Sequence, residues 1–210
     1  MSQIIVDKVE VEVVGNLNVN ENQCTLQMSV KDAVLNAQNS LMNYAETIRK
    51  LKERELWPKR PKHLLPELIQ RIGLITFQGS KALVDYHTAC EREGSEAAIE
   101  NAFAPVQGTD AAAKIAANIN RFSQSRSAYI IVVMLGSGHE KDLSEVFDDY
   151  LVAEAICQSV IPVMTAIGHF SDQTLADVVA DDCDITPTGA AVRLAKIPAK
   201  RSKLFGLLKQ

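Results

Sequence analysis

The chain has 210 residues, 47% of them apolar and 23% charged, which suits one α/β core with a small accessory element rather than two full domains. No apolar run is long enough to span a membrane, and the first residues do not resemble a signal peptide, so we expect a cytoplasmic protein with no membrane partner. The net charge of −4 and the 5% aromatic content are both poor for a nucleic-acid binder.

Cysteine usage and the uneven distribution of charge add two expectations. The four cysteines (Cys24, Cys90, Cys157 and Cys183) are widely separated, so we interpret them as reduced thiols and expect no zinc site. Six basic and no acidic residues lie within 186–210, while the rest of the chain carries a net charge of −10. This basic end could contact a phosphate backbone or an acidic partner, or it could be a solvated helix end.

The N-terminal part predicts a hairpin followed by a long helix. Residues 4–14 and 24–30 alternate apolar and polar side chains on either side of a turn at 15–22 that is rich in Asn and Gly. A hairpin alone is barely stable in water, so it needs support from another element. Residues 31–56 carry an apolar stripe at helical spacing, and the two prolines within 57–65 predict the end of that helix and a basic linker.

The remainder of the chain predicts a mainly parallel sheet. Apolar runs at 72–76, 129–135 and 161–167 have the length and composition of buried parallel strands, and a further strand is expected at 97–103. Helical patterns lie between these strands. We therefore expect an α/β fold, a three-layer Rossmann-like domain with at least four strands in the order second, first, third, fourth. The predicted divisions are a hairpin at 1–30, a helix and linker at 31–65, the α/β domain at 66–195 and a basic tail at 196–210.

Glycines and polar side chains follow three of these strands, where parallel sheets bind their ligands. A glycine turn followed by a helix N-terminus is a favourable binding site for a phosphate group, because unpaired N–H groups and the helix dipole point the same way. A histidine and an aspartate spaced by three lie on one side of a turn, and the plainest interpretation is a half-buried histidine that caps a helix. The residues concerned are Gly79 and Ser80 after the first strand, Gly136, Ser137, Gly138 and His139 after the third, and His169 and Asp172 after the fourth.

The run AIGHFSDQTLADVVAD, followed by ITPTGAA, resembles the large-subunit family of exodeoxyribonuclease VII. The VQG at 106–108 and the glycine loop at 136–138 with its following Asp-Leu pair are similar to further family motifs. The resemblance implies degradation of single-stranded DNA from both ends, without a strict need for a metal cofactor. It also implies an exonuclease VII small subunit as partner, with a homo-oligomer as the alternative, and it makes the hairpin at 1–30 a remnant of an OB-fold.

The resemblance assigns roles to individual residues. It implies that His169 is the acid or base and that Asp172 is its orienting partner or the second acid or base. It also implies that the loop at 136–139 cradles phosphate with Gly79 and Ser80, and that Asp85 orients water or another site residue. The chain departs from the family at Leu135, which stands where the family loop has arginine, and at His139, which stands where it has serine. A guanidinium in that loop would stabilise charge in the transition state, so its role falls in part to His139 or Lys81, or else activity is low.

Two hypotheses about function stay open on the sequence alone. One is hydrolysis of single-stranded DNA through His169 and Asp172, and the other is a catalytically weak homologue that binds nucleic acid or serves in assembly. No metal is required by the first hypothesis, although Asp85, Asp172, Asp177 and His169 could hold one Mg²⁺. We interpret Asp177 and Asp181 as supporting or helix-surface groups rather than as catalytic ones.

Overall fold

The computed structural model describes residues 11–20, 25–57, 62–105, 108–135, 146–168 and 173–199, with side chains from residue 44 on. Two units emerge from the contacts, Met1–Glu46 and Thr47–Gln210. The predicted site residues at 136–139 and at 169 and 172 lie outside the described residues, as does most of the basic tail. No helix within the described ranges is long and apolar enough to cross a membrane.

The first unit contains an antiparallel strand pair with bounds that differ from the prediction. Strands β1 (Val11–Asn20) and β2 (Thr25–Leu35) pair in register from Val11↔Leu35 to Asn20↔Thr25, with a shift at Val14/Gly15. The prediction was therefore wrong at 15–20, which belong to β1 rather than to a turn, and at 31–35, which belong to β2 rather than to the helix. Cross-strand pairing outweighs the weak turn preference of the asparagines here.

Helix α1 (Asn36–Glu53) ends before the prolines that were expected to end it. Glu55 adopts φ 58°, and the N–H groups of Leu56 and Glu55 donate to the carbonyls of Leu51 (2.8 Å) and Lys52 (3.0 Å). These two bonds are the Schellman pattern, which satisfies the last carbonyls of a helix. In the second unit the end of α1 is anchored through Leu51, which is fully buried, and through Arg54, which pairs with Glu154 of α5 (Tyr150–Gln158) at 2.6 Å.

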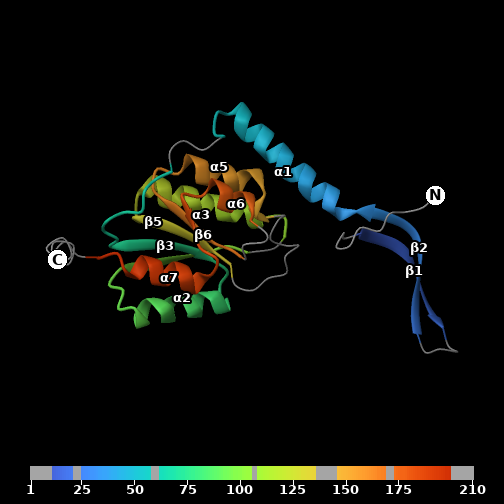
Figure 1. The fold of residues 1–210 in the computed structure, drawn as a ribbon, viewed down its shortest axis with the longest axis horizontal. Helices are drawn as coiled ribbons and strands as arrows, with labels where there is room; N and C mark the ends of the chain where they lie inside the picture. Colours follow the sequence, from blue (N-terminus) through green and yellow to red (C-terminus); the bar gives the residue numbers. More distant parts are fainter. Residues whose placement is uncertain are drawn as a thin grey trace. The chain divides into compact units, whose positions relative to one another are not determined.

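The second unit is built on a five-stranded parallel sheet in the order β4-β3-β5-β6-β7 (Figure 1). The predicted order of the first four strands is confirmed, and the expected α/β fold with it. Strand β5 is buried throughout, because both its faces are covered by helices. The fifth strand, β7, has only two residues and was not predicted. The strands are β3 (Arg71–Thr76), β4 (Ala98–Phe103), β5 (Ile130–Met134), β6 (Val163–Ala166) and β7 (Asp182–Cys183).

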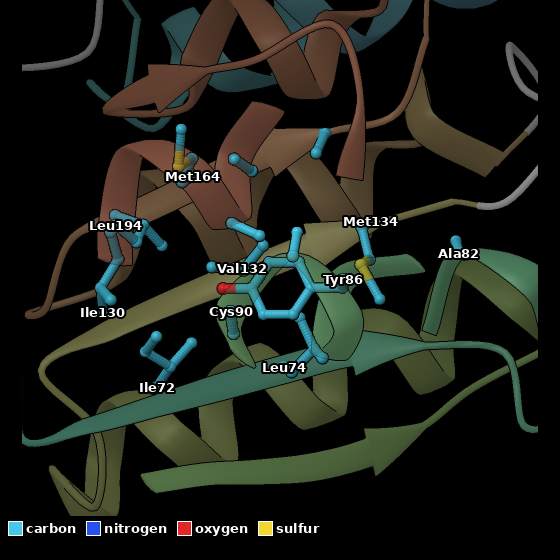
Figure 2. Packing of buried hydrophobic residues seen from close by; sticks show 14 of the residues in the cluster. Ile72, Leu74, Ala82, Tyr86, Cys90, Ile130, Val132, Met134, Met164 and Leu194 are labelled. Atoms are coloured by element: carbon cyan, nitrogen blue, oxygen red, sulfur yellow. The ribbon is translucent and has the colours of Figure 1, made fainter. Parts of the chain in front are cut away.

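Helices cover both faces of the sheet. Helices α2 (Lys81–Arg92) and α7 (Pro187–Ala195) pack on one face, while α3 (Ala111–Ser125), α5 and α6 (Leu175–Val179) lie on the other (Figure 1). Figure 2 shows the first interface, in which side chains of α2 and α7 meet those of the central strands. The residues labelled there are Ile72, Leu74, Ala82, Tyr86, Cys90, Ile130, Val132, Met134, Met164 and Leu194.

On the opposite face, α3 approaches the sheet very closely at Gly73. A Cβ built on Gly73 would lie 2.9 Å from the ring of Phe122, closer than real Cβ atoms come to other heavy atoms. The missing side chain therefore makes room for a fully buried aromatic ring over β3.

Candidate functional site

The loops that carry the predicted site residues leave the sheet from neighbouring backbone positions. Beyond the strands proper, Ala104 N donates to Thr76 O (3.0 Å), and Leu135 N donates to Ala166 O (3.2 Å). The hydrogen-bond ladder thus continues one residue past β4 and β5, to the last residues of β3 and β6. Because all strands are parallel, these ends share one edge of the sheet, where α/β proteins bind their ligands.

The turn between β3 and α2 has the local geometry of a capped helix N-terminus. Gly79 adopts φ 76°, which a residue with a Cβ rarely tolerates. The Ser80 hydroxyl accepts the N–H of Leu83 (3.2 Å) and lies 3.3 Å from the hydroxyl of Thr76, which is buried. The serine hydroxyl is therefore occupied within the fold, and any anion at this turn would meet backbone N–H groups of the first helical turn. Phosphate binding by Gly79 and Ser80 stays a prediction.

Asp85 lies in the second turn of α2 and is exposed. The buried face of this helix is formed by Ala82, Tyr86, Ala89 and Cys90, so Asp85 stands at the border of that face. Its predicted role, orienting water or another site residue, stays a prediction.

Residues 169–172, which we call the motif loop, are followed by a segment that is fixed by a helix cap. Thr174, buried at 6% exposure, begins α6, and its hydroxyl accepts the N–H of Asp177 at 3.3 Å. In return one carboxylate oxygen of Asp177 accepts the N–H (3.0 Å) and hydroxyl (2.8 Å) of Thr174. This reciprocal capping box satisfies two orphan donors of the helix. The structural role of Asp177 agrees with its interpretation as a supporting group.

A second carboxylate reaches the same helix from a distant segment. Asp148, buried just before α5, accepts the N–H of Leu175 at 2.6 Å. Burial raises the pKa of this carboxyl and the charge of Asp177 raises it further, while the Leu175 bond lowers it. Its neighbour Asp149 caps α5 by accepting the N–H of Leu151 at 2.7 Å. No role was predicted for Asp148 from the sequence, although its carboxylate fixes the start of α6.

Asp181 anchors the first residue of β6 to the linker that precedes the sheet. Its two carboxylate oxygens accept the N–H of Val163 and the N–H of His63, each at 2.8 Å. Its own N–H donates to Val163 O at 2.9 Å. This buried carboxylate therefore ties the linker to the first residue of β6, which is a supporting role of the kind expected for it.

The second half of the sequence motif, ITPTGAA, forms the start of α7. Thr186 accepts the N–H of Gly189 at 3.0 Å and Pro187 occupies the first helical position. A Cβ on Gly189 would lie 2.1 Å from the carboxylate of Asp184, so the glycine makes room for that side chain. Later in α7, Arg193 pairs with Asp182 of β7 at 2.5 Å. Arg193, one of the six basic residues within 186–210, therefore has an acidic partner within the fold.

Among the described side chains, no three of the His, Cys, Asp and Glu residues are grouped as metal ligands. The Mg²⁺ set suggested by the sequence includes His169 and Asp172, which lie outside those ranges, so that set stays untested. Cys90, Cys157 and Cys183 form no disulfide within the described ranges. Leu135, in the place of the family arginine, is buried at 5% exposure at the end of β5.

Comparison with known proteins agrees with the motif. The family model "Exonuclease VII, large subunit" matches residues 56–205. Exodeoxyribonuclease 7 large subunits of Streptococcus pneumoniae, strains Hungary19A-6 and JJA, are each 32% identical over 183 residues, covering 87% of this chain and 41% of theirs. The chain therefore spans about two fifths of the length of these curated relatives.

Among solved structures, the A domain of a carboxylic acid reductase from Segniliparus rugosus aligns over 90% of this chain and 28% of its own, at 9% identity and a TM-score of 0.31. That likeness is too weak to carry an argument. The family match and the relatives confirm the resemblance seen in the sequence: the chain belongs to the exonuclease VII large subunit family.

Proposed function

We propose that this chain provides an exonuclease VII-like site that hydrolyses phosphodiester bonds of single-stranded DNA. In this proposal His169 transfers the proton and Asp172 orients its imidazole. One observation carries the proposal: the loop with the family motif leaves β6 next to the end of β5, from which the glycine loop departs. Met134 and Ala166, the last residues of these strands, are register partners.

Hydrolysis needs an activated water, an acid for the leaving oxygen and an offset for the charge that develops at phosphorus. His169 suits the proton transfers, because an imidazole titrates near neutral pH. The backbone N–H groups at Gly136–Gly138, with Ser137 and His139, would receive the phosphate oxygens. Asp85 would orient the attacking water, and Gly79 and Ser80 would meet a neighbouring phosphate at the N-terminus of α2.

The anchoring of the motif loop supports this assignment. On one side, Ile167 is buried at the end of β6, and on the other, Thr174 and Leu175 are held by Asp177 and Asp148. Fixing both ends of a catalytic loop limits the positions its side chains can take, which a site that works by positioning requires. One of these two carboxylates, Asp148, is buried, and both accept hydrogen bonds from the first residues after the loop.

The relatives carry the name of a large subunit, and we extend to this chain an association with an exonuclease VII small subunit. A homo-oligomer is the alternative. Size measurement of the chain alone and mixed with a small subunit separates the two.

The test is cleavage of a single strand labelled at one end. The parent chain should shorten it, His169→Ala should lower the rate by about 10²–10⁴-fold, and Gln173→Ala, an exposed neighbour, should not. Parallel reactions with EDTA, and with Mg²⁺ restored, decide the metal dependence. Equal cleavage by the parent and His169→Ala would refute the assignment. No cleavage by the parent, with retained DNA binding, would favour the alternative function of a binding or assembly module.

A further inference from the structure

Strand β4 is at one end of the sheet order, so among the described strands only β3 pairs with it. At the start of this pair, Ala98 N donates to Gln70 O (2.9 Å). At its end, Ala104 N donates to Thr76 O (3.0 Å). Because successive residues of a strand turn their backbone groups to alternate edges, every second residue of β4 directs its N–H and C=O away from β3. The residues with outward backbone groups are Ile99, Asn101 and Phe103.

The outer edge of β4 lacks the features that usually keep edge strands from pairing. The strand has no proline and no lysine, and its register with β3 is continuous, without a bulge. Its one charged residue, Glu100, is paired with Arg121 of α3 at 2.8 Å. Phe103 O accepts the side-chain amide of Asn118 at 3.3 Å, and a carbonyl oxygen can accept a second hydrogen bond. The strand therefore offers a row of backbone donors and acceptors to another strand.

The side chains of β4 form an uncharged row on one face of the sheet. Ile99 packs against the cluster under α2, so alternation places Asn101 and Phe103 on the same face. Ile99 is partly buried, Asn101 is exposed, and Phe103 is 44% exposed. Glu100 and Ala102 belong to the α3 face, as the pairing of Glu100 with α3 confirms. The row on the α2 face thus has an apolar residue at each end and an amide between them.

We propose that β4 pairs antiparallel with β4 of a second copy of this chain, around a two-fold axis at Asn101. Asn101 is then opposite itself, and Ile99 is opposite Phe103 of the second copy, in backbone hydrogen-bonded pairs. A pair of an aliphatic and an aromatic side chain stabilises neighbouring strands, and the symmetry makes two such pairs. The two five-stranded sheets become one continuous sheet. This inference does not rest on the proposed hydrolysis.

Charge and backbone chemistry select this register over its neighbours. An axis at Glu100 would place that carboxylate opposite its own copy, and like charges directly opposite each other destabilise a strand pair. An axis at Ala102 would place Ile99 opposite Pro105, which has no N–H to donate. With the axis at Asn101, Glu100 is opposite Ala102 and no like charges face each other. The edge is therefore complementary to itself, which favours a second copy over an unrelated protein.

The antiparallel arrangement also fixes where the two proposed active sites lie. Each site is at the carboxyl ends of the parallel strands, and the two-fold axis reverses the strand direction in the second copy. The two sites therefore open at opposite edges of the continuous sheet, and each copy uses its own residues.

The test measures the molar mass of the full chain by sedimentation equilibrium over a range of micromolar concentrations. Asn101→Pro removes the outward N–H at the axis, a change that an edge strand tolerates. Asn101→Lys and Asn101→Asp are measured separately and as an equimolar mixture. Gln158→Lys is the control for an added charge, because Gln158 is exposed on α5, which does not pack on β4. Thermal midpoints verify that each variant is folded.

The parent should be a dimer, and Asn101→Pro should raise its dissociation constant by about 5- to 150-fold, because two hydrogen bonds at the axis are lost. Asn101→Lys and Asn101→Asp should each weaken the dimer, since like charges meet at the axis. Their mixture should recover it, because lysine then faces aspartate. Gln158→Lys should dimerise like the parent.

Three results would overturn the pairing of two copies. The first is a parent that stays monomeric at every concentration, and the second is a dimer that Asn101→Pro does not weaken. The third is a mixture of the two charged variants that dimerises no better than either variant alone. A monomeric parent whose binding to an exonuclease VII small subunit is lost in Asn101→Pro would assign the β4 edge to that subunit instead.

Discussion

Substituting Asp148 by alanine and by asparagine separates two effects that the native carboxylate combines. The side chain is 9% exposed and accepts the N–H of Leu175 at 2.6 Å, so it fixes the start of α6 directly after the motif loop. The same burial, together with the nearby Asp177, raises the pKa of the carboxyl and makes its charge unfavourable in the fold. The hydrogen bond stabilises the protein, while the buried charge opposes it.

The two substitutions therefore have different expected costs. Asp148→Ala leaves the Leu175 N–H without its acceptor, which costs about 1.5–3 kcal/mol for a hydrogen bond to a charged group. Asp148→Asn keeps an oxygen acceptor of the same reach and removes the charge. We expect it to be within about 1 kcal/mol of the parent at neutral pH, because a neutral acceptor avoids the cost of burying a carboxylate. DNA cleavage should fall only in the alanine variant.

The pH dependence gives the sharper comparison. A carboxyl with a raised folded pKa holds its proton longer in the folded than in the unfolded chain, so its contribution to stability falls as pH rises from the unfolded pKa, about 3.9, through the folded one. The asparagine variant lacks this titration, so it should gain stability relative to the parent across that rise. Urea unfolding followed by circular dichroism from acid to neutral pH measures the difference. The reasoning is refuted if Asp148→Asn is as unstable as Asp148→Ala at neutral pH, or loses stability relative to the parent as pH rises.

Three further substitutions test the packing and the supporting carboxylates by chemical denaturation. Gly73→Ala should destabilise the fold by about 1–3 kcal/mol, because its Cβ would press on the Phe122 ring; an unchanged midpoint would contradict the close packing. Asp181→Ala should cost about 2–5 kcal/mol, since it leaves two N–H groups without their acceptor, and a loss below 1 kcal/mol would argue against that anchor. The buried hydroxyl of Tyr86 makes no well-formed hydrogen bond within the described chain, and burial raises its pKa. Its polar neighbour, the Cys90 thiol, is a weak partner, so Tyr86→Phe should leave stability unchanged or slightly higher; a loss above about 1 kcal/mol would contradict this.

The sheet could be predicted because its signal is local. Strands buried on both faces are continuous apolar runs, and the predicted 72–76, 129–135 and 161–167 match β3, β5 and β6 to within two residues at each end. The helix expected after the glycine turn that follows the first strand is α2, which begins at Lys81. The strand order followed from the doubly wound arrangement, in which the order reverses at a switch point between the first and third strands.

The supporting contacts could not be predicted, because they join residues far apart in the sequence. Asp148 meets Leu175 27 positions later, and Asp181 meets His63 across 118 positions. Nothing local distinguishes such an aspartate from a solvent-facing one before the fold is known. Strand β7 was not predicted because it is too short: its two residues, Asp182 and Cys183, are too few to form a pattern.

The family motif consequently combines two kinds of residue that sequence similarity treats alike. Asp177, Asp181 and Thr186 have partners in the fold that account for them, as a helix cap, a strand anchor and a second helix cap. These are sites where a substitution should lower stability before it affects chemistry. The motif residues left to carry the reaction in our proposal are His169 and Asp172.

The buried Leu135 bears on how that reaction could be supported. A leucine 5% exposed at the end of β5 points its side chain into the core, and a charged group in that orientation would have to leave water. Leu135 is therefore a packing residue and offers no positive charge to a phosphate. Positive charge for a phosphate must then come from a neighbouring loop. Lys81, exposed as the first residue of α2, follows the turn after β3, the strand beside β5. A point charge there can attract a phosphate but cannot hold two oxygens in a fixed fork, so we expect this chain to position its substrate through backbone N–H groups more than through a guanidinium.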